Sequence, residues 1–421
     1  MKVLVLNSGS SSVKFKVFDV NGGSQVIAKG SVERIGLTGS RIQCACCETD
    51  WKLCQRQAVF AKSNGLVAVP DHGAAIDAIC KTLLCSDCGV ISDITEIVGI
   101  GHRVVHGGEE FTGSVIIDDD VLAGIRKCSR LAPLHNPPAL EGIEACEKIF
   151  SGIPQVAVFD TAFHHTIPPQ AYRYPVPKSM YTEYGVRKYG FHGTSHHYVA
   201  LEAAKLLGQP LKDLRLITCH LGNGSSITAV DHGKSVETSM GLTPLGGVMM
   251  GTRCGDMDPY IPLFMIKEMG MTADEVDRTL NKQSGFEGVC GHADVRDCEA
   301  LAAKGDPDAQ LALEMFAYRV ARFTGSYAMV MNGVDAIVFT GGIGERGAEM
   351  RSRILKQAGY LGVAIDEEKN ARNERDISQD HATVRVLVIP TDEELMIARE
   401  TARLVTGDGA ANRSERVAET V

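Results

Sequence analysis

The sequence predicts an α/β protein made of two related domains, and two observations support this prediction. The chain has 421 residues, which is more than one ordinary hydrophobic core organises. Residues 216–229 read LITCHLGNGSSITA: an apolar strand, a tip of Gly, Asn and Ser, and a second β-type strand. Residues 3–17 repeat this pattern, with Gly9-Ser10-Ser11 matching Gly224-Ser225-Ser226. A unit that recurs in both halves indicates a duplicated domain with a ligand held between the copies.

Both glycine-rich tips are suited to binding an anion. Glycine allows positive φ and lets a ligand approach main-chain N–H groups, while small hydroxyls add donors without bulk. The alternative is a plain solvent-exposed turn, because short glycine motifs are common. The recurrence of the pattern favours a phosphate site.

Composition narrows the class of protein. The chain is 44% hydrophobic and 23% charged, as in soluble globular proteins. Its net charge of −9 argues against a nucleic-acid partner. The apolar run at residues 3–6 is too short for a signal peptide, and no uncharged run could span a membrane, so we expect a cytoplasmic protein. Of the 13 cysteines, the cluster at 44–47 with Cys54 lacks the paired spacing of zinc sites.

The first half alternates strands and helices, and two strands end in residues suited to chemistry. Arg103, flanked by glycines, is placed to bind a small anion, although a purely structural arginine is the alternative. Asp160 ends a buried strand, where α/β folds place catalytic or metal-binding carboxylates; otherwise it caps the next turn. The expected strands are those within 2–60 (the opening hairpin, 26–32 and 41–47), 97–100 and 155–160, and the expected helices are 71–84 and 139–150.

Two histidines and one arginine stand out in the middle of the chain. His192 and His196 are four residues apart just before and within a predicted helix over 195–207. We favour His192 as a donor to an anion and His196 as a packed core residue, with a zinc site as the weaker alternative. Residues 239–259 match neither helix nor strand and hold Arg253 among glycines and methionines, which is typical of a functional segment.

The last third adds another phosphate-binding candidate. A helix over 310–331 is followed by a buried strand at 336–340 that runs into Gly341-Gly342-Ile343-Gly344-Glu345. This turn is neither a dinucleotide fingerprint nor a Walker A loop. A strand at 384–389 leads to a final helix ending near 404, whose first turn carries Glu393, and residues 407–421 read as a frayed tail.

Together these features indicate phosphoryl transfer, which needs a phosphate cradle, a metal and positive groups more than covalent chemistry. At this level of detail the chain resembles the acetate kinase family, which belongs to the superfamily of sugar kinases, actin and heat-shock chaperones. The motifs that carry the resemblance run nearly end to end: VLNSGSSSVKF (5–15), GHRVVHGG (101–108), APLHNPP (132–138), VFDTAFH (158–164), YGFHGTSH (189–196), HLGNGSS (220–226), MGTRCGDMDP (250–259), FTGGIGE (339–345) and PTDEELMIARET (390–401).

The resemblance implies a reversible reaction in which ATP and acetate give ADP and acetyl phosphate with Mg²⁺, or with Mn²⁺ in its place. It implies two duplicated ribonuclease-H-like domains of the actin-like ATPase kind, with a cleft between them, in a homodimer. The acetate-side domain would comprise 1–160 and 396–421, and the nucleotide-binding domain 161–395.

The resemblance also implies roles for matching residues. Arg103 would hold the acetate carboxylate, and Asp160 would be the essential carboxylate near the reacting centre. His192 and Arg253 would stabilise the transferred phosphoryl group. Larger sets would serve the other ligands: Mg²⁺ by Asn7 and Glu393, directly or through water; the ATP phosphates by Lys14, Ser10 and Ser12; the nucleotide by His220, Leu221, Gly222, Asn223, Gly224, Asp294, Val295, Arg296, Gly341, Gly342, Ile343, Gly344 and Glu345; and the acetate methyl group by Val105, Leu134, Phe191 and Pro244.

Two other functions stay open. A propionate kinase would have the same machinery. The bulk of Val105 makes acetate the first choice and propionate a slower substrate. One methylene in an apolar pocket is worth only ~1–3 kcal/mol, so this is a preference and not an exclusion. An actin-like nucleotide-binding protein without small-acid chemistry would share the hairpins but would have no need for Arg103, Arg253 and the apolar pocket together. The chain departs from the family pattern at Arg346 and at residues 290–293, so nucleotide preference is less firmly implied than reaction type.

Overall fold

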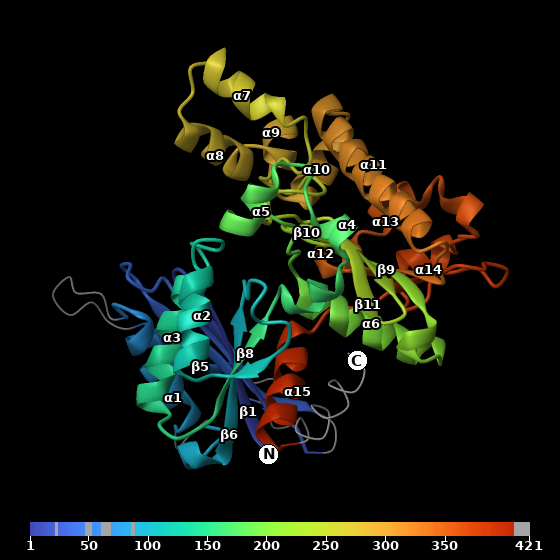
Figure 1. The fold of residues 1–421 in the computed structure, drawn as a ribbon. Coiled ribbons are helices and arrows are strands. Elements are labelled where there is room, and N and C mark those ends of the chain that lie inside the picture. The colour runs from blue at the N-terminus through green and yellow to red at the C-terminus, as the bar shows by residue number, and fades with distance from the viewer. Residues whose placement is uncertain (22–23, 47–52, 60–68, 86–88, 408–421) are drawn as a thin grey trace. The chain divides into compact units, whose positions relative to one another are not determined.

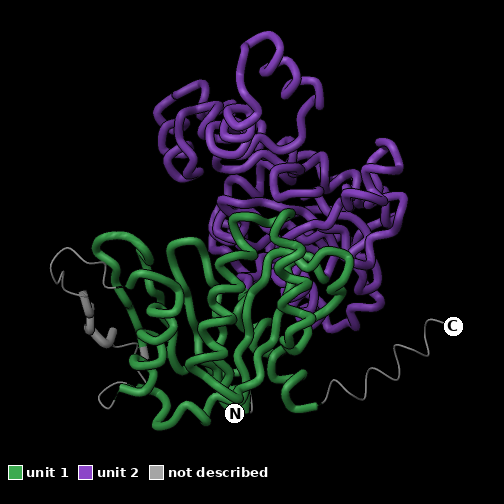
Figure 2. Tube along the Cα trace, turned by 60° about the vertical axis from the view of Figure 1, so that its left-hand side comes forward, with its two compact units in different colours: residues 1–162, 392–421 green, residues 163–391 purple. Residues whose placement is uncertain are grey.

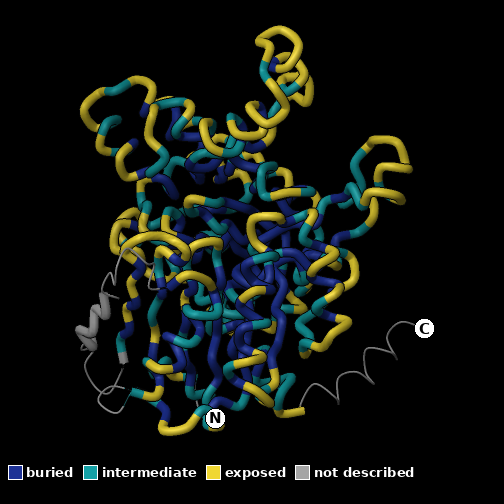
Figure 3. Tube along the Cα trace, turned by 90° about the vertical axis from the view of Figure 1, so that its left-hand side faces the viewer, coloured by how far each residue is buried: buried dark blue, intermediate teal, exposed yellow. Residues whose placement is uncertain are grey.

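The chain forms two compact units, which are described separately. The computed structural model describes residues 1–21, 24–46, 53–59, 69–85 and 89–407. Unit 1 comprises Met1–Ala162 and Asp392–Val421, and unit 2 comprises Phe163–Thr391 (Figure 2). The central strands of both sheets are largely buried, and Figure 3 colours the described residues by how far each is buried. Within the described ranges, no helix combines the length and apolarity needed to cross a membrane.

Unit 1 is built on an eight-stranded sheet in the order β5-β4-β3-β2-β1-β6-β8-β7 (Figure 1). β1, β6 and β8 are parallel neighbours, and the remaining pairs are antiparallel. The strands are β1 (Lys2–Gly9), β2 (Ser12–Asp19), β3 (Gln25–Glu33), β4 (Arg41–Cys46), β5 (Leu53–Val59), β6 (Ile97–Val104), β7 (Val115–Ile116) and β8 (Gln155–Phe159). The helices are α1 (His72–Leu83), η1 (Ile94–Glu96), α2 (Asp119–Cys128), α3 (Asn136–Ile149) and α15 (Glu393–Val405).

Alternation along the strands sends their side chains to two separate cores. Leu4 and Leu6 of β1 pack with α1 and α3, whereas Val3 and Val5 pack with α15. α15 approaches β6 closely because β6 has glycine at positions 99 and 101. A side-chain carbon added to Gly101 would lie 2.4 Å from Thr401 Oγ1 and 2.6 Å from Ile397 Cγ2. This close approach places the first turn of α15 beside the end of β6.

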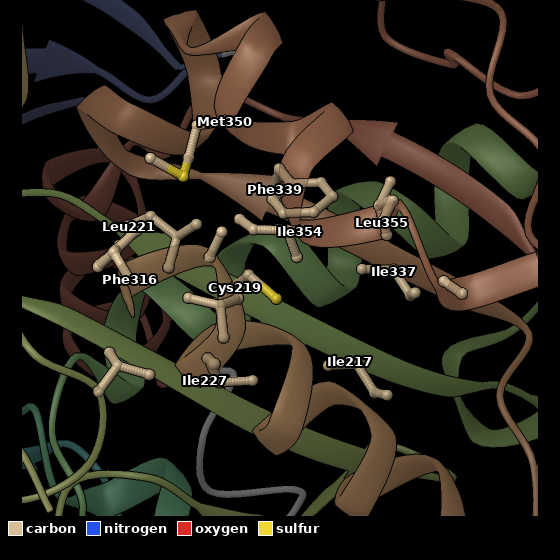
Figure 4. Close-up of a cluster of buried hydrophobic side chains, with 14 of the residues drawn as sticks. Ile217, Cys219, Leu221, Ile227, Phe316, Ile337, Phe339, Met350, Ile354 and Leu355 are labelled. Carbon is tan, nitrogen blue, oxygen red and sulfur yellow. The ribbon is translucent and has the colours of Figure 1, made fainter. Parts of the chain in front are cut away.

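Unit 2 is built on a five-stranded sheet in the order β11-β10-β9-β12-β13, with β9, β12 and β13 parallel. Figure 4 shows one face, where strand residues such as Ile217, Cys219 and Phe339 meet Phe316 and Ile354. α6 covers the other face. The strands are β9 (Arg215–Leu221), β10 (Ser225–Asp231), β11 (Lys234–Thr238), β12 (Ala336–Thr340) and β13 (Arg385–Val388).

The helices of unit 2 lie mostly after β11. They are α4 (Pro169–Tyr172), α5 (Lys178–Tyr184), α6 (Gly193–Leu207), η3 (Leu211–Asp213), α7 (Tyr260–Lys267), α8 (Ala273–Lys282), α9 (Gly285–Cys290), α10 (Val295–Ala302), α11 (Pro307–Val330), α12 (Gly341–Arg346), α13 (Ala348–Leu355), η4 (Ala358–Leu361) and α14 (Glu367–Ala371). A further short turn, η2 (Ala162–Thr166), lies at the junction of the units.

The structure confirms both predicted hairpins. β1 pairs antiparallel with β2, and β9 pairs antiparallel with β10 in the same manner. The predicted irregular segment 239–259 contains no helix or strand, although all of its residues are described. The cysteine cluster, for which a metal was the weaker alternative, falls partly outside the described residues, since these exclude Cys47. β4 and β5 place Cys44 opposite Cys54. Residues 408–421 of the predicted frayed tail (407–421) also lie outside them.

Four predicted boundaries were wrong. The helix expected over 310–331 begins at Pro307, because proline fits a first helical turn. The strand expected at 97–100 continues to Val104, so Arg103 lies within it. The helix expected from 139 begins at Asn136, because Pro137 and Pro138 fit a first helical turn. The helix expected from 195 begins at Gly193, since the backbone of His192 adopts φ 57° and starts the helix there.

The compact units also divide at positions other than those predicted. The first junction follows Ala162 rather than residue 160, and the second follows Thr391 rather than residue 395. Asp392 accepts a hydrogen bond from Leu395 N at 3.0 Å and thereby caps α15. Because α15 packs on the sheet of unit 1, its cap and its first turn belong to unit 1.

Candidate active site

Unit 1 gathers polar residues at the carboxyl ends of its parallel strands. Leu6 pairs with His102, and Val104 pairs with Phe159. Asn7 and Asp160 therefore flank Arg103 on neighbouring strands. Alternation places Asn7 and Arg103 on the face covered by α15, because their neighbours Val5 and Gly101 contact that helix. The carboxyl edge of a parallel sheet is where α/β proteins bind ligands.

Arg103 forms a two-point ion pair with Asp160. Its Nε donates to Asp160 Oδ1 at 3.0 Å, and its Nη2 donates to Asp160 Oδ2 at 2.6 Å. Glu393 Oε2 lies 3.7 Å from the same Nε. Burial alone would lower the pKa of Arg103, but Asp160 and Glu393 hold that pKa above its ordinary value. The two bonds to Asp160 use two of the five guanidinium N–H groups, which leaves three to bind a further anion.

Glu393 lies at the acidic start of α15. Burial raises its pKa to about 6; Arg103 opposes this rise, and Asp160, Glu394 and Asp392 add to it. The side chains of Asp392 and Glu394 are both 3.2 Å from Lys16 Nζ. The sequence analysis did not single out Lys16. The available signal was its position two residues after Lys14, which places both lysines on the same face of the strand. The raised pKa means that the ionised form of Glu393 is disfavoured in unit 1, and a bound cation would stabilise that form.

Replacing Glu393 by glutamine is expected to stabilise the metal-free protein above pH 6. The folded-state pKa is raised, so the ionised carboxylate disfavours the fold, and this penalty grows as pH rises from 4.5 to about 6. A rise from 4.5 to about 6 corresponds to roughly 2 kcal/mol. Urea unfolding with a chelator should therefore show Glu393→Gln gaining roughly 2 kcal/mol over the wild type between pH 4.5 and about 7. A difference that does not change with pH would contradict this assignment.

Buried amide and hydroxyl groups hold the loop after β6. Asn136 Oδ1 accepts from His106 N at 3.1 Å, and its Nδ2 donates to His106 O at 2.9 Å. Thr161 Oγ1 accepts from Gly107 N at 3.0 Å. These bonds fix Val105, one of the predicted pocket residues, just after Arg103. Another of that set, Leu134, is 65% exposed in unit 1.

The predicted phosphate-binding residues of the first hairpin lie around its turn. Lys14 is exposed and pairs with Asn7 across the hairpin, and Ser12 pairs with Gly9. Ser10 is exposed at the turn itself. The hairpin therefore presents Lys14 on the same face as Asn7, as a shared anion and metal site would require.

In unit 2, three glycine-containing segments meet. Gly341 adopts φ 75°, and a side-chain carbon there would lie 2.7 Å from Leu221 O, so the backbone of α12 touches the end of β9. Gly251 N donates to Asn223 O at 3.3 Å. Within the turn of the β9–β10 hairpin, Gly222 N donates to Gly224 O at 3.1 Å. Side chains at these positions would fill the space that backbone contacts now occupy.

His192 and Arg253 lie beside the tip of the β9–β10 hairpin. A carbon added to Gly224 would be 3.5 Å from His192 Nε2 and 3.7 Å from Arg253 Nη1. Arg253 Nη1 donates to Pro244 O at 3.1 Å, and burial lowers its pKa. Arg253 forms no ion pair with any described carboxylate. A half-buried guanidinium without an acidic partner is a strong candidate for binding an anion.

Two serines connect the histidines of this site. Ser226 Oγ lies 2.9 Å from His192 Nδ1 and 2.8 Å from His196 Nε2. Ser195 Oγ lies 2.8 Å from His220 Nδ1, and the rings of His192 and His220 stack with centroids 4.3 Å apart. Burial, with His164 and His220 nearby, holds the pKa of His196 well below its ordinary value. The structure confirms His196 as a packed, hydrogen-bonded residue, and no cluster of three metal-binding side chains occurs among the described residues.

Other predicted nucleotide-site residues have structural contacts of their own. Glu345 Oε1 accepts from Gly341 N at 3.0 Å and from Thr391 N at 3.1 Å, so this carboxylate holds the glycine turn. Asp294 caps α10 and binds Arg296, whose side chain is 84% exposed. Phe191 is buried, and Pro244 lies beside Arg253 through its carbonyl group. The remaining members of the set lie on the segments that meet at the hairpin tip: Leu221, Gly342, Ile343 and Gly344, with Val295 on α10.

Comparison with known proteins identifies the family. The acetokinase family profile matches residues 2–399. The chain belongs to the acetokinase family. It is 52% identical to an acetate kinase of Heliobacterium modesticaldum over 409 residues, which are 97% of this chain and 100% of the relative. It is 51% identical to an acetate kinase of Methanosarcina acetivorans over 417 residues, covering 98% of this chain and 99% of the relative.

Solved structures agree with this family assignment. The acetate kinase of Porphyromonas gingivalis is similar with a TM-score of 0.88 and 41% identity, and the alignment covers 96% of this chain and 99% of that one. A propionate kinase from Francisella tularensis is similar with a TM-score of 0.85 and 44% identity over the same shares. These similarities confirm the predicted fold class. Family membership was therefore recognisable from the motifs alone.

Proposed function

We propose that this protein is an acetate kinase, which transfers the γ-phosphoryl group of ATP to acetate and runs reversibly through acetyl phosphate and ADP. Its family uses ATP or ADP and transfers phosphate to a carboxyl acceptor. The observation that carries the proposal is Arg253, a half-buried guanidinium with no acidic partner among the described residues, next to His192 and Gly224. Such a group stabilises charge on a phosphoryl group during transfer.

The acid would bind in unit 1. Arg103 has N–H donors beyond those used by Asp160, and a planar guanidinium matches a carboxylate. Asp160 fixes the plane of that guanidinium. Val105 and Leu134 of unit 1 would contribute to the pocket for the methyl group. The nucleotide would bind in unit 2 against His220–Leu221 and the glycine-containing segments.

We propose Mg²⁺ as the metal, with Mn²⁺ able to replace it. Mg²⁺ keeps several waters and usually takes one or two protein oxygens plus phosphate oxygens. Asn7 and Glu393 fit this modest demand, because an amide oxygen and a partly buried carboxylate with a raised pKa lie on the α15 side of unit 1. When bound, the ion would neutralise charge on the phosphates. Glu393 would hold it as the ionised carboxylate, and Asn7 through its amide oxygen.

The deciding experiment is a hydroxamate assay for acetyl phosphate with purified protein, ATP and acetate. Ratios of kcat/KM for acetate, propionate and butyrate would separate the first proposal from the second candidate, a propionate kinase. That candidate has a specific basis, since the Francisella propionate kinase structure is nearly as similar as the acetate kinase structure. A propionate value well above the acetate value would favour it. Nucleotide binding without any acyl phosphate would favour an actin-like binding protein instead.

We also propose that the protein acts as a homodimer in the cytoplasm, with α7 at the subunit contact. α7 is a short helix whose side chains are largely apolar yet exposed: Tyr260, Ile261, Leu263, Phe264 and Ile266. Exposed apolar side chains gathered on one short helix are typical of protein–protein contacts. A second copy of the chain is the occupant that the family resemblance implies.

Phe264→Glu is expected to convert a dimer into a monomer in light scattering after size-exclusion chromatography, because it places a charge in an apolar contact. Phe264 is 49% exposed, so the monomer should keep its fold and its melting temperature. Tyr360→Glu is the matched control, since Tyr360 is 76% exposed and lies on η4. An unchanged dimer in Phe264→Glu would place the contact elsewhere.

A further inference from the structure

Two cysteines of unit 2 lie in contact near the glycine-containing segments. Cys290 is the last residue of α9, and Cys298 lies in α10. Their Sγ atoms are 3.2 Å apart, and both thiols point to His292 O, at 3.8 Å from Cys290 Sγ and 3.3 Å from Cys298 Sγ. Cys298 is fully buried, whereas Cys290 is half-buried and reachable from solvent.

Packing against α11 holds the two helices in this arrangement. Phe286 of α9 and Cys298 of α10 belong to one hydrophobic core with Phe316 of α11. Between the helices, Gly291 turns the chain with φ 75°. The two sulfurs are thus brought together by helix packing as well as by the short connection between them. A disulfide needs S–S ≈ 2.05 Å, so about 1 Å of movement would join them.

We propose that Cys290 and Cys298 form an oxidation site, a dithiol that peroxides or small disulfides convert reversibly into an intramolecular disulfide. The Cys290 thiolate attacks hydrogen peroxide, the O–O bond breaks, and a sulfenic acid and hydroxide form. The Cys298 sulfur then attacks the Cys290 sulfur, the S–O bond breaks, and the thiol proton of Cys298 leaves with the oxygen as water. In total, two thiols and one peroxide give one disulfide and two waters. A thiol reductant reverses the change.

The order of these steps follows from the environment of each sulfur. Burial and the neighbouring Cys290 raise the pKa of Cys298 to about 12, so Cys298 stays a thiol until it reacts. Cys290 is the more accessible sulfur and is the one that the oxidant meets first. In a reducing compartment the disulfide would form only under oxidative conditions, as for redox-sensing cysteines in general.

The disulfide would act on the nucleotide side of the protein. Glu287 N of α9 donates to Gly251 O at 2.9 Å, and Phe286 N donates to Met250 O at 2.9 Å. Ala293 O lies 2.9 Å from where a carbon on Gly251 would be, and Gly251 contacts Asn223. Drawing α9 and α10 together therefore shifts residues that touch the tip of the β9–β10 hairpin. This second part rests on the proposed function, whereas formation of the disulfide does not.

The test is carried out on the full-length chain in a Cys254→Ser background, which removes the thiol next to Arg253. Protein treated with hydrogen peroxide is alkylated, digested without reductant and analysed by mass spectrometry. We expect a peptide pair linked through Cys290 and Cys298, lighter by the two hydrogens lost and separated by dithiothreitol. We expect the KM for ATP to rise about fivefold or more in the linked protein and to recover on reduction.

Variants make the test decisive. Cys298→Ala keeps a small apolar side chain in the core and should give no linked peptide and no change in KM for ATP; melting temperature checks that it folds. Cys290→Ser tests the accessible partner in the same way. Cys85→Ser removes a half-buried thiol of unit 1, and this variant should still form the link between Cys290 and Cys298. Separate alkylation or over-oxidation of Cys290 and Cys298 would overturn the oxidation site. If the disulfide forms without a change in the KM for ATP, the proposed effect on nucleotide binding is overturned. If the reduced protein has no kinase activity, only the proposed function is overturned.

Discussion

Replacing Arg253 by alanine is expected to lower kcat by about 10³-fold while leaving the KM for acetate within about threefold. Arg253 is half-buried, its pKa is lowered by burial, and it forms no ion pair among the described residues. Its charge is therefore available to a ligand. The attraction between Arg253 and the phosphoryl oxygens strengthens as negative charge develops on those oxygens. Initial rates of acetyl hydroxamate formation against each substrate would measure both constants.

Two variants show whether this loss is specific. Arg253→Lys keeps the charge but not the planar fork, so it should recover only part of kcat. Arg322→Ala removes an exposed arginine of α11 and should leave kcat unchanged. Full activity in Arg253→Ala, with the melting temperature preserved, would remove Arg253 from the catalytic machinery and would favour a nucleotide-binding protein without transfer chemistry.

Replacing Asp160 by asparagine is expected to lower kcat/KM for acetate by about 10²-fold, because Arg103 loses the two-point contact that sets its plane. The pair is largely buried, so leaving Arg103 without its main counter-charge should also cost about 3–5 kcal/mol of stability. Steady-state kinetics at saturating ATP and urea unfolding would measure the two effects. Asp160→Glu keeps the charge and should retain more activity than Asp160→Asn.

A double-mutant cycle separates two roles for Asp160. If Asp160 acts through Arg103, then Asp160→Asn should add little to Arg103→Ala in kcat/KM for acetate. If Asp160 also acts at the reacting centre, its loss should lower kcat further in the Arg103→Ala background. Independent, fully additive effects on kcat/KM would contradict the view that the two residues bind the acid as a unit.

Local patterns in the sequence were sufficient for much of the fold and for the family. The two hairpins, the helix that became α11 and the strands β8, β12 and β13 are continuous segments whose apolar spacing and turn residues report their structure directly. The motifs around Arg103, Asp160 and Gly341 identified the acetokinase family because each is a contiguous run of residues. The boundaries at Gly193 and Val104 were missed, since the positive φ of His192 and the pairing of β6 with β1 depend on neighbours elsewhere in the chain.

Which residues of those motifs lie close together in space is decided by the tertiary structure. The sequence alone identified Arg103, Asp160 and Glu393 as candidates, but Asp160 and Glu393 are 233 positions apart in the chain. Only the packing of α15 on Gly101 places Glu393 3.7 Å from Arg103. The same holds for Lys16 beside Asp392, for Ser226 between His192 and His196, and for Cys290 against Cys298. Chain order determines which side chains are available and on which local element they lie. Distances between elements arise from burial of apolar faces across the whole unit, which no local run of residues encodes.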